Sequence, residues 1–336
     1  MSSDPAVSAT PAAHDARAFW VVERERGEIR TESLPPRGSD EVLVEARFGA
    51  ISRGTELLVF RGRVPPSEYE RMRAPHQGGA FPWPVKYGYA TVGVVRLGPR
   101  ELLGRDVFCL HPHQTAFVVP AASVVPLPAG VSPERAVLAA NLETAINVVW
   151  DAGVKTGDRV AVVGAGVVGA LVAFVASRHP GTDVELVDTD PVRRRIADLL
   201  GISFAHPSAA RSDADVVVHA SGAPDGLTTA LALAGTEATV VEASWFGDRP
   251  VTLPLGGAFH AKRLRIASSQ VGQLPPDQRA RWTRRRRLEL ALRLLADVPF
   301  DELVVETPFD ELPSLMPRIA AGGDSTWCHR VRYPEG

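Results

Sequence analysis

The stretch VVGAGVVG, residues 162–169, spaces its glycines in a way that suits phosphate binding. The spacing is G-x-G-x-x-G, at Gly164, Gly166 and Gly169. The first glycine permits a tight turn, the second lets the backbone approach a pyrophosphate, and the third lets a helix pack closely on a strand. The following helix begins near Val167 and Val168, and its N-terminus offers free N–H groups and a positive dipole. We therefore predict a dinucleotide-binding loop.

An acidic residue at the end of the next apolar run indicates which dinucleotide binds. Asp188 follows Gly169 by about 20 residues, where a carboxylate accepts hydrogen bonds from the ribose hydroxyls. A negative charge there repels a 2′-phosphate, so NAD is expected rather than NADP. Arg193 and Arg194 are the residues that would bind a 2′-phosphate instead, but we expect them to face solvent. The alternative for the motif is a glycine turn in a protein that binds nothing.

Small or polar residues also follow three later apolar runs, in HASGAP, VEASWFG and ASSQVG. At the carboxyl ends of parallel strands such residues would face the nicotinamide. The predicted cofactor-binding residues in these segments are Ser221, Gly222, Ser244 and Ser269. For any one of them, ordinary loop polarity is the alternative.

An alternation of strands and helices from Arg159 onward must position these residues. Apolar strands joined by helices predict a parallel sheet covered on both faces, as in a Rossmann domain. The uncharged run at 160–177 is about as long as a bilayer is thick. Its three glycines favour a strand, a turn and a helix over a membrane span. A further helix is predicted from Ser132 to Val149.

The rest of the chain predicts a second, β-rich domain. Short strand-like runs punctuated by Gly and Pro extend to about Pro128. From about Val271 the tail predicts a helix, a strand, a helix and a strand, which we expect to return to the first domain. The predicted boundaries are a disordered tail at 1–17, a β-rich domain at 18–135 and 273–336, and a cofactor domain at 136–272.

Composition narrows the class of protein. The 336 residues are 45% hydrophobic and 23% charged, as in soluble proteins of about two domains. A net charge of −2 gives no general attraction to nucleic acid or membrane. Two cysteines are too few for a disulfide framework or for a zinc lobe held by four thiolates. The N-terminal segment also lacks the pattern of a signal peptide, so we expect a cytoplasmic location. We expect the arginines at 281–287 to form a solvated helix face.

Three segments resemble the medium-chain dehydrogenase/reductase superfamily. GAISRGTELLVFRG is similar to the family segment with the core Cys-Gly-Thr-Asp, and its SRGTE further resembles bacteriochlorophyllide a dehydrogenases. VKYGYATVGVV lies where the family has Gly-His-Glu before a strand, and DAGVKTGDRVAVVGAGVVG is similar to the approach to the cofactor loop. The resemblance covers roughly residues 18–333. It implies a GroES-like catalytic domain, a Rossmann domain and a homodimer.

The chain departs from that resemblance at the catalytic zinc site. Matched residue by residue, Arg53 stands at the cysteine position, Tyr89 at the histidine position and Ala90 at the next glutamate. Only Glu143 remains as a possible third ligand. Because arginine keeps its proton and a phenol is a poor ligand, we expect no metal. A site built from the His-x-His pair at 111–113 is the alternative.

Organic groups must then supply the proton transfer and oxygen stabilisation that accompany hydride transfer. We predict Tyr89 as the acid/base, Thr55 as a relay and Arg53 as an electrostatic partner. Glu56 and Glu143 would pair with Arg53 or act as bases, and His111 would lie nearby. The alternatives are a Tyr89 that only fills space and an Arg53 buried in an ion pair.

The predicted function is an NAD-dependent oxidoreductase that interconverts a secondary alcohol and a ketone without catalytic zinc. The substrate would be a small molecule in the cleft between the domains. Two alternatives remain: a zinc-free reductase of enones or quinones, and a non-catalytic dinucleotide sensor.

Overall fold

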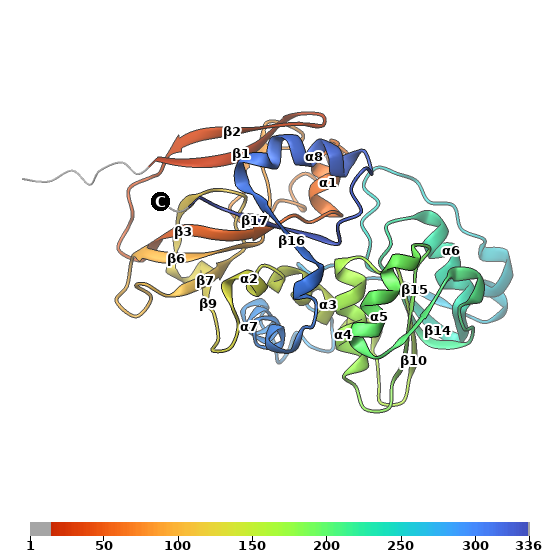
Figure 1. Ribbon diagram of the computed structural model, residues 1–336. Helices are drawn as coiled ribbons and strands as arrows, with labels where there is room; N and C mark the ends of the chain where they lie inside the picture. The colour runs from red at the N-terminus through yellow and green to blue at the C-terminus, as the bar shows by residue number, and fades with distance from the viewer. Residues whose placement is uncertain (1–14, 335–336) are drawn as a thin grey trace, which may run out of the picture.

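The computed structural model describes residues 15–334 and contains three sheets (Figure 1). Strand β1 begins at Asp15, so the last three residues of the expected disordered tail belong to a strand. The rest of that tail, residues 1–14, lies outside the described residues. Figure 1 shows the β-rich part on the left and the strand–helix part on the right.

Two sheets form the β-rich part. The larger has the order β16-β17-β3-β6-β7-β9, with β8 paired to β3. Its strands are β3 (Glu41–Ala50), β6 (Thr91–Leu97), β7 (Asp106–Cys109), β8 (Ala116–Pro120), β9 (Val124–Pro126), β16 (Val304–Pro308) and β17 (Cys328–Arg332). The smaller sheet contains β2 (Arg26–Ser33), β1 (Asp15–Glu23), β5 (Val85–Lys86) and β4 (Gly78–Gly79). Helices α1 (Thr55–Phe60), α2 (Pro133–Ala136) and α8 (Leu312–Ala320) complete this part.

The third sheet is parallel and has the order β12-β11-β10-β13-β14-β15. Its strands are β10 (Arg159–Val163), β11 (Asp183–Val187), β12 (Ser203–Ala205), β13 (Ala214–His219), β14 (Ala234–Glu242) and β15 (Arg265–Ser268). The helices beside it are α3 (Ala139–Ala152), α4 (Val167–Ser177), α5 (Arg194–Leu200) and α6 (Pro224–Leu233). The strand order reverses at β10, and in such sheets ligands bind at the carboxyl ends beside that point. The predicted fold class is confirmed.

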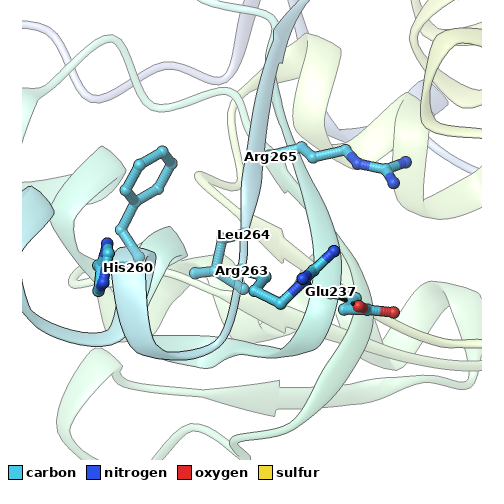
Figure 2. A pocket seen from close by; sticks show the side chains of 6 residues that line it. Glu237, His260, Arg263, Leu264 and Arg265 are labelled. Carbon is cyan, nitrogen blue, oxygen red and sulfur yellow. Dashed lines mark ion pairs between the residues drawn. The ribbon is translucent and has the colours of Figure 1, made fainter.

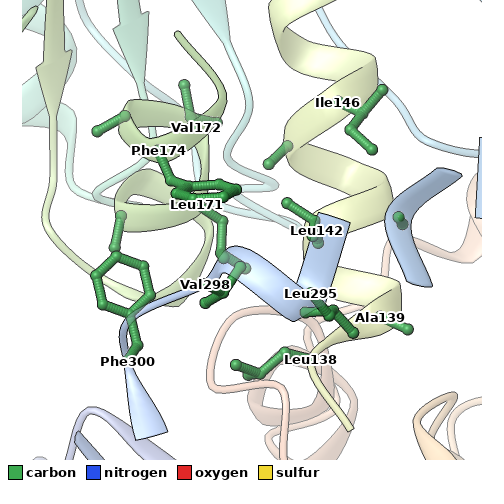
Figure 3. Packing of buried hydrophobic residues seen from close by; sticks show 14 of the residues in the cluster. Leu138, Ala139, Leu142, Ile146, Leu171, Val172, Phe174, Leu295, Val298 and Phe300 are labelled. Carbon is green, nitrogen blue, oxygen red and sulfur yellow. The ribbon is translucent and has the colours of Figure 1, made fainter. Parts of the chain in front are cut away.

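A continuous apolar core joins α3 and α4 to the segment after α7 (Arg284–Leu294). Figure 3 shows Leu142 and Ile146 of α3 near Leu171 and Phe174 of α4, with Leu295 beside them. The run at 160–177 is therefore a buried strand, a turn and a helix, as predicted. Within residues 15–334, no helix is long and apolar enough to cross a membrane.

Two local predictions are only partly right. The helix expected from Ser132 to Val149 is broken into α2 and α3, and the Ser132 hydroxyl accepts from the Arg135 amide at 3.3 Å to cap the first piece. The arginines at 281–287 do not all face solvent. Arg287 is only 1% exposed because its guanidinium pairs with a buried carboxylate of α3.

Candidate active site

The glycine loop has the shape that its spacing predicts. Gly164 follows β10 with φ of 106°, and a Cβ there would lie 2.6 Å from the Ser221 backbone nitrogen. A Cβ on Gly169 would lie 1.8 Å from the Gly164 carbonyl oxygen, so α4 packs on the strand only without a side chain. A Cβ on Gly166 would meet nothing within 4 Å. The loop is thus tight where it packs and open where a ligand approaches.

Asp188 connects the end of β11 to this loop. Its Oδ2 accepts a hydrogen bond from the Ala165 amide at 2.7 Å, and its Oδ1 accepts from the Asp190 amide at 2.9 Å. The carboxylate is partly buried and keeps further lone pairs for ribose hydroxyls. Gly166, the open loop and this carboxylate fit the phosphate and adenosine ribose of a dinucleotide.

Of the predicted polar residues at the strand ends, those after β13 and β14 contact each other, whereas the Ser269 side chain after β15 contacts α3. The Gly222 amide donates to the Ser244 hydroxyl at 3.0 Å, which joins the turns after β13 and β14. Ser269, beyond β15, instead donates to Asp151 Oδ2 of α3 at 2.6 Å. Asn147 of α3 donates to the same Ser269 oxygen at 3.3 Å. Ser269 therefore helps to fix α3 to the sheet.

Tyr89 lies in the loop between β5 and β6 and contacts the loop before α1. Its hydroxyl donates to Ser52 Oγ at 2.6 Å. Burial raises the pKa of Tyr89 to about 12, and the nearby Glu56 carboxylate adds to this, while hydrogen bonds with Ser52 and Thr55 oppose it. Tyr89 is therefore a neutral phenol at physiological pH, which can donate a hydrogen bond to a substrate oxygen, and its phenolate form becomes populated only at high pH.

A chain of buried polar side chains holds Ser52 in position for its contact with Tyr89. Glu56 Oε1 accepts from the Ser52 amide at 2.9 Å, and Glu56 Oε2 lies 2.9 Å from His113 Nε2. His113 Nδ1 in turn lies 3.3 Å from the hydroxyl of Tyr333, just beyond β17. Glu56, His113 and Tyr333 are each at most 5% exposed. Because Glu56 is committed to His113 and to the loop, it positions Ser52 rather than pairing with Arg53.

Ser52, which sequence analysis did not select, occupies the place expected for Arg53. Arg-Gly-Thr-Glu, residues 53–56, aligns with Cys-Gly-Thr-Asp residue for residue, which places Arg53 at the cysteine position and Ser52 just before it. In the structure Ser52 meets Tyr89, whereas Arg53 points elsewhere. No signal in the sequence pointed to Ser52, because its contact with Tyr89 joins residues 37 positions apart.

Arg53 is bound to the chain segment that precedes β17. It donates to the carbonyl oxygens of Asp324, at 2.7 Å, and of Thr326. Arg193, from the cofactor part, donates to the Ser325 carbonyl oxygen at 3.1 Å. The pKa of Arg53 is lowered, mainly by burial and further by Arg193, whereas the Asp324 carboxylate opposes the shift. The alternative of an Arg53 ion pair with Glu56 or Glu143 is wrong, and the segment at 324–326 is instead fixed from both sides.

Glu143 lies in the helical core, where its role differs from the predicted one. Its Oε1 is 3.1 Å from Nε of Arg287 on α7, and both side chains are almost completely buried. Arg287 also donates to the Asn147 side chain and the Val271 carbonyl oxygen. Burial raises the pKa of Glu143, although the Arg287 charge opposes this. Glu143 therefore joins α3 to α7 and is not free to act as a base or metal ligand.

His111 is also separated from the Tyr89 contact. Its ring stacks on Phe117 with centroids 3.8 Å apart, and its Nδ1 lies 2.9 Å from the Pro112 carbonyl oxygen. Burial lowers its pKa to about 3, so His111 is neutral. The His-x-His pair is divided, since His113 contacts Glu56 while His111 packs on an aromatic ring.

No group of three or more His, Cys, Asp or Glu within residues 15–334 is arranged to hold a metal ion. The absence of catalytic zinc stays a prediction. Two surface pockets, of about 360 and 430 Å³, lie away from Tyr89. Figure 2 shows the smaller one, where Glu237 and Arg263 form an ion pair near the start of β15.

The related proteins and similar structures found by comparison are dehydrogenases. No protein-family model matches the chain. The D-guloside 3-dehydrogenase of Escherichia coli strain K12 is 28% identical over 291 residues, which cover 76% of this chain and 81% of that protein. A Sinorhizobium meliloti 1021 structure with NADP bound, described as a zinc-binding dehydrogenase, has 19% identity and a TM-score of 0.75, covering 95% and 99% of the two chains. An E. coli CFT073 protein described as a short chain alcohol dehydrogenase, solved with NADH, has 17% identity and a TM-score of 0.73, covering 96% and 99%.

The predicted resemblance to the medium-chain dehydrogenase/reductases is confirmed, because a relative named as a dehydrogenase matches most of the chain and solved dehydrogenases share its fold. The comparisons support an oxidoreductase that acts on a sugar or an alcohol. They also support a nicotinamide dinucleotide as the cofactor.

Proposed function

We propose that this protein is an NAD(H)-dependent oxidoreductase that interconverts a secondary alcohol and a ketone without catalytic zinc. The observation that carries the proposal is the contact between Tyr89 and Ser52, at 2.6 Å. It lies where the family resemblance places the zinc ligands, and it consists of two hydroxyl groups. The glycine loop and Asp188 supply the second half of the site.

Asp188 and the loop support NAD over NADP. A 2′-phosphate would lie against the Asp188 carboxylate, which repels it. Arg193, the nearest candidate to neutralise such a phosphate, already contacts the Ser325 carbonyl oxygen and lies 3.4 Å from an Asp190 carboxylate oxygen. When bound, the cofactor would accept or donate the hydride.

The chain's own groups would handle the proton. With its pKa raised to about 12, Tyr89 holds its proton at neutral pH and can donate it to the oxygen of a ketone. Ser52 and Thr55 hold the phenol in place, and the Glu56–His113 pair fixes the Ser52 backbone. In the direction of ketone reduction, Tyr89 is the acid and Ser52 orients it. In alcohol oxidation the phenolate form is needed, which favours high pH.

The substrate class follows from the relatives. The D-guloside 3-dehydrogenase is named for oxidation of a ring hydroxyl on a sugar, so we propose a polyhydroxylated secondary alcohol for this chain. A polar network around Tyr89 suits hydroxyl-rich ligands better than the purely apolar enones of the alternative reductases.

One experiment tests the proposal. NADH and NADPH are titrated separately by fluorescence, and the complex is then offered sugars, sugar ketones, enones and quinones while NADH absorbance is followed. We expect tighter NADH binding and turnover with a keto sugar. Binding without turnover on every substrate would favour a sensor, and turnover on enones alone would favour the other reductase class.

We further propose that two copies pair through β15 in the cytoplasm. β15 is at an edge of the parallel sheet, and Ile266 on it is 38% exposed. An edge strand offers unpaired main-chain groups to a second copy. The two cysteines are free thiols, as expected for a reducing compartment. The mass of the protein in solution checks the dimer.

A further inference from the structure

A serine, a histidine and a glutamate form a hydrogen-bonded row at the carboxyl ends of β13 and β14. Ser221 Oγ lies 2.6 Å from His219 Nε2, and His219 Nδ1 lies 2.7 Å from Glu242 Oε2. His219 and Glu242 are the last residues of the two adjacent strands and are paired in register. Sequence analysis named only Ser221, although two ionisable residues ending apolar strands were a signal for the other two.

The serine of this row is accessible to a substrate, while the histidine is buried and the glutamate is mostly buried, which suits nucleophilic catalysis. Ser221 is exposed, the His219 side chain is 0% exposed, and the Glu242 side chain is 13% exposed. In the neutral tautomer that lets Nε2 accept the serine proton, Nδ1–H donates to Glu242. Glu242 Oε1 also accepts from the Ser244 amide at 2.6 Å, which fixes the carboxylate. The order of a serine, a base and an orienting acid is the same as in a catalytic triad.

Two backbone amides lie in the turn that follows the serine, and one of them donates to the serine oxygen. The Gly222 amide donates to Ser244 Oγ at 3.0 Å, and the Ala223 amide donates to Ser221 Oγ at 3.2 Å. Both acceptors are neutral hydroxyls, so either amide would bind an oxyanion more strongly. The turn also leads into α6, whose N-terminus adds positive potential. Arg249 donates to the Gly222 carbonyl oxygen and places a cation beside the turn.

We propose that Ser221 is a nucleophile toward small carboxylic esters when no cofactor is bound. Ser221 Oγ forms a bond to the ester carbonyl carbon while its proton passes to His219 Nε2, and the carbonyl becomes an oxyanion. Collapse breaks the C–O bond, and the proton goes from His219 to the leaving alcohol. Water then attacks the acyl-serine with His219 as base and releases the carboxylic acid. The sequence needs no oxidant or reductant.

The chain contains a matched control with the same spacing. Ser208 Oγ lies 2.8 Å from His206 Nδ1, two residues earlier, and both residues are exposed. Within residues 15–334, His206 has no ion pair with a carboxylate. A serine beside an unsupported, solvated imidazole is expected to be ordinary. Any difference in reactivity between Ser221 and Ser208 therefore measures the effect of the buried His219 and its partner Glu242.

The test treats cofactor-free, full-length protein with a fluorophosphonate probe and, separately, with 4-nitrophenyl acetate. Peptide mass spectrometry is expected to find the phosphonyl group on Ser221 and not on Ser208. Ser221→Ala should remove ester hydrolysis above background, and His219→Gln should slow acylation on the order of 100-fold. Ser208→Ala should hydrolyse the ester as the natural chain does. Circular dichroism and thermal unfolding establish that each variant is folded.

Two results would overturn the proposal: equal labelling of Ser221 and Ser208, or full ester hydrolysis by folded Ser221→Ala. Neither measurement involves hydride transfer. Failure to bind or oxidise NADH would refute the proposed dehydrogenase and leave the reactivity of Ser221 to be decided by the probe alone.

Discussion

Replacing Tyr89 by phenylalanine removes one oxygen atom from the proposed proton path. The lost contact is the 2.6 Å hydrogen bond to Ser52 Oγ, whose removal should lower the free energy of unfolding by about 1 kcal/mol. The catalytic effect should be much larger. A positioned acid contributes about 10²–10⁴ in rate, which corresponds to about 3–5 kcal/mol of transition-state free energy.

The assay is NADH-dependent ketone reduction under saturating cofactor, with NADH affinity measured in parallel. We expect Tyr89→Phe to lower kcat by about 10²–10⁴ while the Kd for NADH stays within about twofold. Tyr87→Phe is the matched control. Tyr87 is also a buried tyrosine in this loop, but its hydroxyl makes only a 3.4 Å contact with the Met72 carbonyl oxygen. It should keep full activity.

The reasoning is refuted by a folded Tyr89→Phe protein with unchanged kcat, because Tyr89 would then only fill space. It is weakened equally by a loss of activity in Tyr87→Phe, since that would point to packing around the loop. A matching loss in Ser52→Ala, smaller than in Tyr89→Phe, would support an orienting role for the serine.

Three further predictions concern pH, cofactor choice and the helical core. Because the pKa of Tyr89 is raised to about 12, the rate of alcohol oxidation should rise with pH up to at least pH 10. The rate of ketone reduction should stay level from pH 7 to 10. A plateau in the oxidation rate near pH 8 would assign the proton transfer to another group. Asp188→Ala should weaken NADH binding by about 1.5–3 kcal/mol and improve the relative binding of NADPH, and an unchanged preference in titrations would refute the ribose assignment. Arg287→Met should cost about 3–5 kcal/mol in denaturant unfolding because it leaves the Glu143 carboxylate unpaired, and adding Glu143→Leu should restore much of that loss; equal stability of all three proteins would contradict the buried pair.

The parts of the molecule that depend on local pattern could be predicted from the sequence. The glycine loop followed from three glycines with distinct steric duties, and the structure gives each one that duty. The parallel sheet followed from apolar strands alternating with helices. Tyr89 was selected because it replaces a histidine in a segment of clear resemblance.

The remaining features depend on contacts between residues distant in the chain, which no local pattern reports. Arg287 was expected in solvent because it stands among arginines, yet it pairs with Glu143 across 144 positions. The match to the family selected Arg53, yet the fold places Ser52 against Tyr89 and Arg53 against the segment at 324–326. Similarly, the role of His113 depends on the fold, which brings Glu56 of α1 to it across 57 positions of the chain.

The central claim is that two hydroxyl groups, rather than a metal ion, assist hydride transfer at this site. The most direct measurement combines zinc analysis with turnover on protein exhaustively treated with a chelator. We predict less than one zinc per chain, with NADH-dependent reduction unchanged by the chelator and not increased by added zinc. Activity that disappears with the metal and returns when zinc is restored would contradict the account.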